Sequence, residues 1–199
     1  MKFLFQKFSP LKKVSFFILF FISLISLQSY ASVDGKMMIK ESKIVWEGSK
    51  VTGSHEGTVN LKSGFLVFKN GGLVGGEFIL DMTSIVCTDL SGKGKASLEN
   101  HLKNADFFDV NNYPTAELII LGAEKGGAEQ EYTIKAEITI KEITQKIAFK
   151  AKIERKKARA RLVIDRTLFG IIYKSGNFFK GLADKAIYDE FKIGIDLVF

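Results

Sequence analysis

Apolar and polar side chains alternate through almost the whole chain after residue 43. The clearest run is residues 132–140, where apolar side chains take every second position and Lys135, Glu137 and Thr139 lie between them. Successive side chains of a strand point to opposite faces, so this spacing predicts strands with one face in a core. Three later segments repeat the pattern: residues 147–153, 160–164 and 191–199. We therefore expect an all-β chain.

Short turn-forming stretches separate these runs. Asn70-Gly71-Gly72 lies between the apolar runs 65–69 and 73–82, and an Asn-Gly pair is a strong hairpin signal. Other glycines indicate sharp bends within the first runs: Gly48, Gly53, Gly57 and Gly64. Short connections imply antiparallel neighbours, and closure of the sheet removes its exposed edges. The pattern predicts an antiparallel closed barrel of about eight strands.

One segment departs from this pattern. Residues 76–82 still alternate, but Leu98 and Leu102 are four residues apart, which places them on one face of a helix. Residues 91–95 carry two glycines and two lysines, and we expect an open loop there. Pro114 prevents any further helix. The sequence therefore predicts one short helix, residues 97–103, inserted midway along the chain as a lid on the barrel.

This segment also carries a family resemblance. The run HLKNADFFDVNNYPTA, residues 101–116, follows GGEFILDMTSIVCTDL, residues 75–90, and together they resemble the YceI-like family. The likeness extends to WEGSKVTGSHEG, residues 46–57, and to RTLFGI, residues 166–171. Members of that family are periplasmic, lipocalin-like proteins that bind polyisoprenoids. Two departures are Cys87, where threonine or valine is commoner, and Glu99-Asn100, where an Arg-Asp type pair is common.

The first 31 residues have the features of a signal peptide. Four lysines and no acidic residue accompany an apolar run at residues 14–27, which is shorter than the stretch of about 20 residues that spans a membrane. Small residues, Ser29 and Ala31, precede the expected cleavage site. We expect cleavage near Ala31 and a periplasmic or secreted YceI-like domain at residues 32–199. An uncleaved anchor is the alternative.

Removal of this segment lowers the formal charge from +7 to +3, because its four lysines leave with it. Nothing in that charge requires nucleic acid as a partner. Charged side chains occupy the outward positions of the expected strands, which argues against the apolar outer band of a membrane-spanning barrel. Cys87 is the only cysteine and lies beside Ile85 and Val86. We expect it to be buried, with a reactive or dimer-forming thiol as the alternative.

Residues suited to catalysis are scarce. The sequence has no nucleophile elbow, no metalloprotease helix and no glycine-rich phosphate loop. His55 and His101 are far apart, so we expect no metal site and assign both to structural roles. Asp106 and Asp109 flank a Phe pair after the helix, where turn formation explains them better than acid–base catalysis. We therefore expect a protein that is not an enzyme.

The resemblance implies a hollow barrel that binds a long isoprenoid lipid of the quinone or polyprenyl phosphate class, with no other cofactor. A nine-residue strand spans roughly 30 Å, which suits an extended chain. Seven large apolar residues are candidates for the wall of the cavity: Trp46, Phe65, Phe78, Phe107, Phe108, Phe149 and Phe169. Three polar residues near expected strand ends are candidates for holding the head group: His55, Arg166 and Lys174.

Two further hypotheses remain open from the sequence. A filled barrel could act in structure or stress response through a protein partner, with the Phe178-Phe179 pair in the loop 174–185 as the contact. The basic run at residues 155–161 is either a solvated hairpin tip or a patch that makes transient contact with anionic membrane surfaces. The sequence is compatible with a monomer or a homodimer.

Overall fold

The computed structural model describes residues 34–199. The predicted signal segment, residues 1–31, lies outside the described residues. The described part consists of strands, one α-helix and two short 3₁₀ turns: β1 (Gly35–Met38), β2 (Glu41–Lys50), β3 (Gly53–Lys69), β4 (Gly72–Cys87), α1 (Gly92–Lys103), β5 (Thr115–Lys125), β6 (Glu131–Ile140), β7 (Ile143–Glu154), β8 (Lys157–Asp165), η1 (Arg166–Phe169), η2 (Ala183–Lys185) and β9 (Ile187–Val198).

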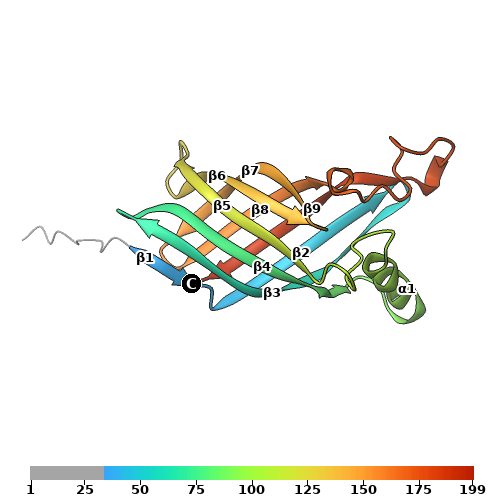
Figure 1. Ribbon diagram of the computed structural model, residues 1–199, viewed down its shortest axis with the longest axis horizontal. Helices are drawn as coiled ribbons and strands as arrows, with labels where there is room; N and C mark the ends of the chain where they lie inside the picture. The colour runs from blue at the N-terminus through green and yellow to red at the C-terminus, as the bar shows by residue number, and fades with distance from the viewer. Residues whose placement is uncertain (1–33) are drawn as a thin grey trace, which may run out of the picture. The chain divides into compact units, whose positions relative to one another are not determined.

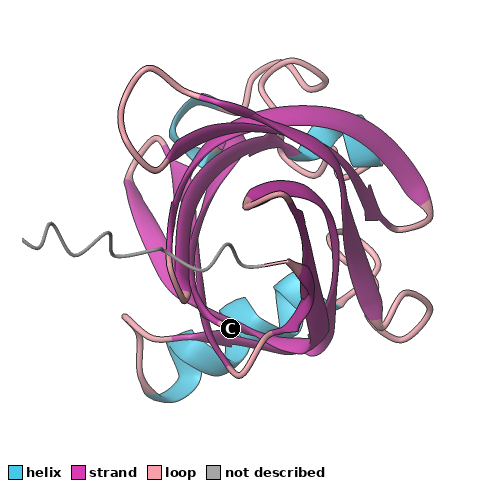
Figure 2. Ribbon diagram, turned by 90° about the vertical axis from the view of Figure 1, so that its left-hand side faces the viewer, coloured by secondary structure: helices cyan, strands magenta, loops and turns pink. Residues whose placement is uncertain are grey.

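The strands close into one antiparallel barrel. From β3 to β9 each strand pairs with the next, β9 returns to pair with β2, and β2 pairs with β3 to complete the ring (Figures 1 and 2). Strand β1 continues β2: both pair with β3 in one register, with Met38 opposite Phe65 and Val45 opposite Thr58. The prediction of a closed barrel of about eight strands with one helix is confirmed.

Two tight turns show how local sequence sets the register. Between β3 and β4, Asn70 and Gly71 both have positive φ, 52° and 72°, which defines the hairpin turn that the Asn-Gly pair predicts. Between β6 and β7, Lys141 and Glu142 adopt the same conformation at φ 50° and 62° without a glycine. That second turn is fixed by the ten paired residues on each side of the hairpin rather than by its own residues.

The interior of the barrel is made by alternating apolar side chains. In β6 the buried residues are Ile134, Ala136, Ile138 and Ile140, as the sequence pattern predicts. The same inward face continues on β7, β8 and β9, so one continuous core runs along the barrel. Burial of apolar area stabilises it at about 25 cal/mol per Å².

Bulges in β3 reverse this alternation, and here the sequence interpretation was wrong. Val59 points inward, but the register shift between Leu61 and Ser63 moves the inward face to Leu66 and Phe68. Phe65 therefore lies on the outer face, where the Lys36 ammonium sits 3.5 Å from the centre of its ring. A bulge adds one residue to one strand, so every later side chain changes face.

Helix α1 begins at Gly92, five residues before the predicted start. The prediction of an open loop at residues 91–95 was therefore wrong for residues 92–95, which are helical. The two glycines in the first turn of this helix lower its intrinsic helix propensity. Tertiary contacts support it instead: Glu99 Oε1 accepts a hydrogen bond from the Cys87 N–H at 2.8 Å, and the Lys95 ammonium lies 3.7 Å from the same oxygen. The helix is thus tied to the end of β4.

Gly57 is the position at which the barrel wall has least room. A Cβ there would lie 1.9 Å from the Val86 carbonyl oxygen and 2.5 Å from Cζ2 of Trp46. We predict that Gly57→Ala lowers the free energy of unfolding by about 3 kcal/mol, because backbone and indole would both have to shift. Urea unfolding of the parent and the variant measures this loss of free energy.

The matched control is Gly194→Ala in β9, where a Cβ would meet nothing within 4 Å. Its free energy of unfolding should change by less than about 0.5 kcal/mol. Equal losses for the two variants would contradict the close packing at Gly57.

Candidate functional site

The barrel encloses a cavity of about 200 Å³. Its lining is almost wholly apolar and comes from the inward faces of β2 to β9, from α1 and from the segment that follows it. Examples are Leu66, Met82, Ile138 and Ile193. Such a surface attracts apolar ligands and offers little to a sugar or a nucleotide.

The structure brings five of the seven wall candidates to this cavity: Trp46, Phe78, Phe107, Phe108 and Phe149. The other two lie elsewhere. Phe65 faces outward because of the bulge in β3. Phe169 is fully buried in η1 but does not line the cavity. That turn is held by Asp165, whose Oδ1 accepts hydrogen bonds from the N–H and the hydroxyl of Thr167, and by Gly170 in the left-handed conformation.

The cavity reaches the surface at the end of the barrel that carries α1, which we call the mouth. Its lining there includes Ser49 and Tyr188, and Tyr188 is 54% exposed. In Figure 1 this is the end with α1 and the loop between η1 and β9. At the opposite end the rings of Phe68 and Phe199 stack at 5.6 Å, and both residues are buried. The stacked rings therefore cover part of this opposite end.

Arg166 is the one buried charged side chain among the described residues, at 3% exposed, and it lines the cavity near the mouth. Its guanidinium donates to three backbone oxygens: Tyr188 O at 3.1 Å, Ile187 O at 3.0 Å and Ile171 O at 2.6 Å. A fourth hydrogen bond runs from Nη2 to Asp189 Oδ1 at 3.2 Å. These bonds join η1 to the start of β9.

Asp189 links Arg166 to the loop before β9. Its Oδ2 accepts from the Ser175 hydroxyl at 2.9 Å and from Asn177 Nδ2 at 2.7 Å. Burial lowers the pKa of Arg166, and the carboxylates of Asp189 and Asp165 oppose that shift. The charge of Arg166 is thus balanced inside the protein. Sequence analysis missed Asp189 and Ser175, because alternation does not reveal which polar residues turn inward.

The other two polar candidates lie away from the cavity lining. His55 Nδ1 is 3.0 Å from Asp89 Oδ2 on the outer side of β3. Lys174 has its ammonium 5.2 Å from the centre of the Tyr173 ring, in the loop after η1. Only Arg166 of the three lines the cavity.

Cys87, Asp89 and His55 form a hydrogen-bonded chain on the wall near α1. The buried Cys87 thiol donates to Asp89 Oδ1 at 2.9 Å, and His55 meets the other oxygen. Burial, followed by the bond to Asp89, raises the pKa of the Cys87 thiol. The bonds from Cys87 and His55 lower the pKa of Asp89 to about 2. A protonated, fully buried thiol is a poor nucleophile, so this cluster has a structural role.

An aromatic cluster closes part of the mouth. The His101 ring on α1 packs edge-on against Phe107 at 4.9 Å and against Tyr173 at 4.5 Å. Asp106 and Asp109 lie in the turns after α1: the Asp106 N–H donates to Asn104 Oδ1, and Asp109 Oδ2 accepts from Asn112 Nδ2. These contacts are those of turn formation.

Within residues 34–199, no three His, Cys, Asp or Glu side chains are placed to hold a metal ion. No helix in that part of the chain is long and apolar enough to cross a membrane.

Comparisons with known proteins agree with this architecture. The profile of the YceI-like domain matches residues 33–199, so the chain belongs to the YceI-like family. A search of curated protein sequences found no match to the chain.

Solved structures with the same fold include BcnA from Burkholderia cenocepacia, at 18% identity and TM-score 0.61, covering 79% of this chain and 96% of that one. A polyisoprenoid binding domain from Saccharophagus degradans, implicated in plant cell wall breakdown, has 10% identity and TM-score 0.55 and covers 83% and 97%. The YceI protein of Campylobacter jejuni has 17% identity and TM-score 0.52 and covers 69% and 81%.

Arg166 should be central to the stability of the mouth. We predict that Arg166→Met lowers the free energy of unfolding by about 3–5 kcal/mol, because it leaves three backbone oxygens and Asp189 Oδ1 without the guanidinium donor. Urea unfolding followed by circular dichroism measures the loss.

Arg159→Met is the control. Arg159 Nε lies 3.1 Å from Asp196 Oδ1, but both side chains are at least 60% exposed. Arg159→Met should lower the free energy of unfolding by less than about 1 kcal/mol. An equally small loss of free energy for Arg166→Met would show that the hydrogen bonds of Arg166 contribute little to stability.

Proposed function

We propose that this protein binds a long isoprenoid lipid and removes its apolar tail from water. The observation that carries the proposal is the apolar cavity inside a closed barrel of the YceI-like family. The polyisoprenoid binding domain of similar fold supports the choice of ligand class. Binding needs no catalytic group, and we propose a carrier or storage role rather than an enzymatic one. The lipid is the bound ligand, and we propose no cofactor.

The expected mode of binding places the tail along the barrel axis and the head near the mouth. Strands such as β6, with ten residues, extend for roughly 33 Å, which matches an extended chain of several isoprene units. Each Å² of tail surface taken from water contributes about 25 cal/mol. Arg166 lines the cavity, and we propose it as a polar neighbour of a quinone or polyprenyl phosphate head.

The cavity of about 200 Å³ is smaller than the roughly 300–1,000 Å³ of most small-molecule sites. A long tail therefore requires movement of the parts that cover the mouth, or it extends out of the barrel. Phe107 and Phe108, on the connection after α1, are the side chains that must yield first. The lid role expected of the helix from the sequence stays a prediction.

We also propose that the protein works in the periplasm or outside the cell, on the strength of the signal-like residues 1–31. A lipid carrier is useful there because a polyisoprenoid has to cross water between membranes. Either a monomer or a homodimer fits this role.

Native mass spectrometry of the protein purified from its own compartment tests the proposal. We expect an added mass equal to that of a polyprenyl lipid, or uptake of one added in detergent. A mass without ligand, together with no uptake of quinone or polyprenyl phosphate, would favour the filled barrel.

Ala151→Phe sharpens this experiment, because Ala151 lines the cavity in β7 and a phenyl group there fills much of the space. We predict at least a tenfold loss of lipid uptake. Ala148→Phe, on the exposed face of the same strand, should bind as the parent does.

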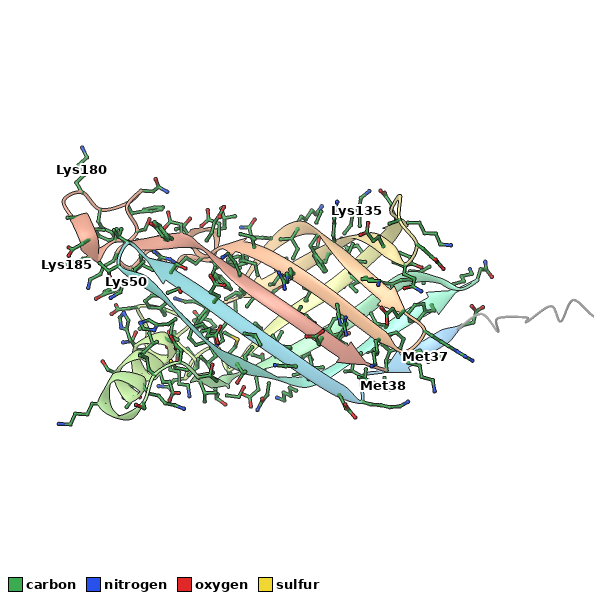
Figure 3. The ribbon with its side chains drawn as sticks, turned by 180° about the vertical axis from the view of Figure 1, so that it is seen from behind. Met37, Met38, Lys50, Lys135, Lys180 and Lys185 are labelled. Atoms are coloured by element: carbon green, nitrogen blue, oxygen red, sulfur yellow. The ribbon has the colours of Figure 1, made fainter. Side chains whose placement is uncertain are left out.

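A membrane is the natural source of the lipid, and we propose that the mouth faces it. Phe178 and Phe179 are 57% and 45% exposed in the loop beside the mouth. Figure 3 shows Lys50, Lys180 and Lys185 at this same end, where the Val51 N–H bonds to Ala186 O. Exposed rings with basic neighbours suit an anionic bilayer surface. The basic run 155–161 lies at the other end, beside Val198.

Replacement of Phe178 and Phe179 together by serine should lower co-sedimentation with anionic vesicles at least fivefold, because the rings no longer enter the interface. Val163→Ser, an exposed apolar residue on β8, is the control. If vesicle binding is unchanged while a protein partner is lost from pull-downs, the loop contacts protein instead. Charge reversal within residues 155–161 tests the other end in the same assay.

A further inference from the structure

The wall of the barrel is only partly paired between β7 and β8. The ladder that joins these two strands has four rungs, from Glu154–Lys157 to Ala151–Ala160. By contrast, β6 pairs with β7 over ten rungs and β8 pairs with β9 over nine. Among the described residues, 143–150 of β7 are therefore paired only with β6, and 161–165 of β8 only with β9. We call these two facing stretches the seam.

The seam lies directly over the apolar cavity. If the register continued, its first two rungs would place Lys150 opposite Arg161 and Phe149 opposite Leu162. Phe149 and Leu162 both line the cavity, as does Ile164 farther along β8. Apolar side chains rather than ladder hydrogen bonds therefore close the wall at this place.

Burial changes along β7 where the ladder ends. The inward residues of its paired part, Ala151 and Ile153, are buried. The inward residues of the seam, Ile147 and Phe149, are only half-buried. In β6, which is paired on both sides, the inward residues from 134 to 140 are all buried. The wall is thus packed less tightly along the seam.

The charges on the outer face change at the same point. Lys152 and Arg159 face each other within the ladder, and each has a carboxylate oxygen within 3.3 Å. Lys150 and Arg161 come one rung beyond its end, and no ion pair within residues 34–199 includes either of them. Like charges directly opposite each other destabilise strand pairing. Their repulsion therefore favours an open seam.

The seam reaches the mouth of the cavity. At that end Gln145 Nε2 donates to the Leu168 carbonyl oxygen of η1 at 3.1 Å, which holds the two sides together. Exposed apolar side chains border it, with Ile143 39% and Leu168 53% exposed. From Gln145 to the Ala151 rung the strand extends for roughly 20 Å at about 3.3 Å per residue. The seam thus runs from the mouth down the side of the barrel.

We infer that the seam is a slit that extends the mouth and parts to let the apolar tail of the ligand enter from the side. Parting a fully paired wall would break ladder hydrogen bonds. Parting the seam breaks the Gln145 bond and separates apolar side chains, whose contacts the incoming tail replaces. A tail that enters sideways need not thread its whole length through the mouth. The inference rests on the proposed function and adds the path of the ligand.

A reversible cross-link across the seam tests this path. Ala148→Cys with Val163→Cys places two exposed thiols on the facing strands. Dithiobis(maleimidoethane) joins them through a disulfide that a reductant cuts. We expect the cross-linked protein to take up hexaprenol at least tenfold more slowly, as timed by native mass spectrometry, and to regain its rate on reduction.

Lys135→Cys with Ala148→Cys is the matched control, because these two residues are ladder partners on β6 and β7. Its cross-link joins strands that are already paired and should change the rate of uptake less than twofold. The parent protein treated with the same reagent controls for Cys87, which is fully buried. Equal slowing by both cross-links, or slowing by neither, would overturn the inference.

Lys150→Glu tests the part played by charge repulsion. A carboxylate at this position would attract Arg161 across the end of the ladder and favour a closed seam. We expect uptake to slow about threefold, with Lys150→Gln between the parent and this variant. Affinity at equilibrium should stay within twofold, because Lys150 is exposed and does not line the cavity. A lower affinity with an unchanged rate would contradict a role in entry.

Hydrogen exchange in the parent protein examines the seam without any lipid. Strand β6 is paired on both sides, whereas roughly half of the amides of residues 144–150 point toward the seam. We expect that half to exchange rapidly while the amides of residues 133–140 stay protected. Full protection of both stretches would mean that β7 and β8 are paired in solution, and the slit would be excluded.

The two proposals fail in different ways. A parent protein that takes up no lipid would refute the proposed function and this path together. A parent that binds hexaprenol, but whose uptake is unaffected by the seam cross-link, would refute the path alone.

Discussion

The structure depends on the long, bulged pairing of β3 with β4. These strands have 17 and 16 residues, and three shifts of register let them coil enough to bring the sheet back to β2. Closure leaves the barrel without a free edge between β2 and β9 and turns one face of every strand inward. The end of β4 also anchors α1 through the bond between Cys87 and Glu99. The apolar cavity inside the closed sheet and the position of α1 at its mouth both depend on this pairing.

Local sequence was sufficient where one rule acts alone. Regular alternation predicted the inward face of β6 correctly, and Asn70-Gly71 predicted its hairpin. Local sequence failed to predict the inward face where the register is set by a neighbouring strand. The spacing of Phe65 from Val59 suggested that both face inward, but the bulge after Leu61 places Phe65 on the outer face. The early start of α1 at Gly92 is a second case, because tertiary bonds override weak helix propensity.

The polar part of the site was the least visible in the sequence. Arg166 was identified from its place near a strand end, but its partner Asp189 and the linked Ser175 are separated from it by a loop. Their closeness depends on how β9 returns beside η1, which no local pattern encodes. This network neutralises the charge of Arg166, so the residue that most resembles an anion-binding group is largely committed to holding the mouth together.

That commitment changes how selectivity can arise in such a barrel. Apolar walls discriminate weakly, since one methylene group more or less changes binding by only about 1–3 kcal/mol. A buried donor discriminates more sharply, because a ligand without an acceptor leaves it unpaired while a ligand with one relieves an existing cost. The indole of Trp46 carries a buried N–H without a partner among residues 34–199, but that nitrogen is not on the accessible surface of the cavity. An almost wholly apolar lining therefore supplies affinity for apolar surface and little discrimination among ligands of that kind.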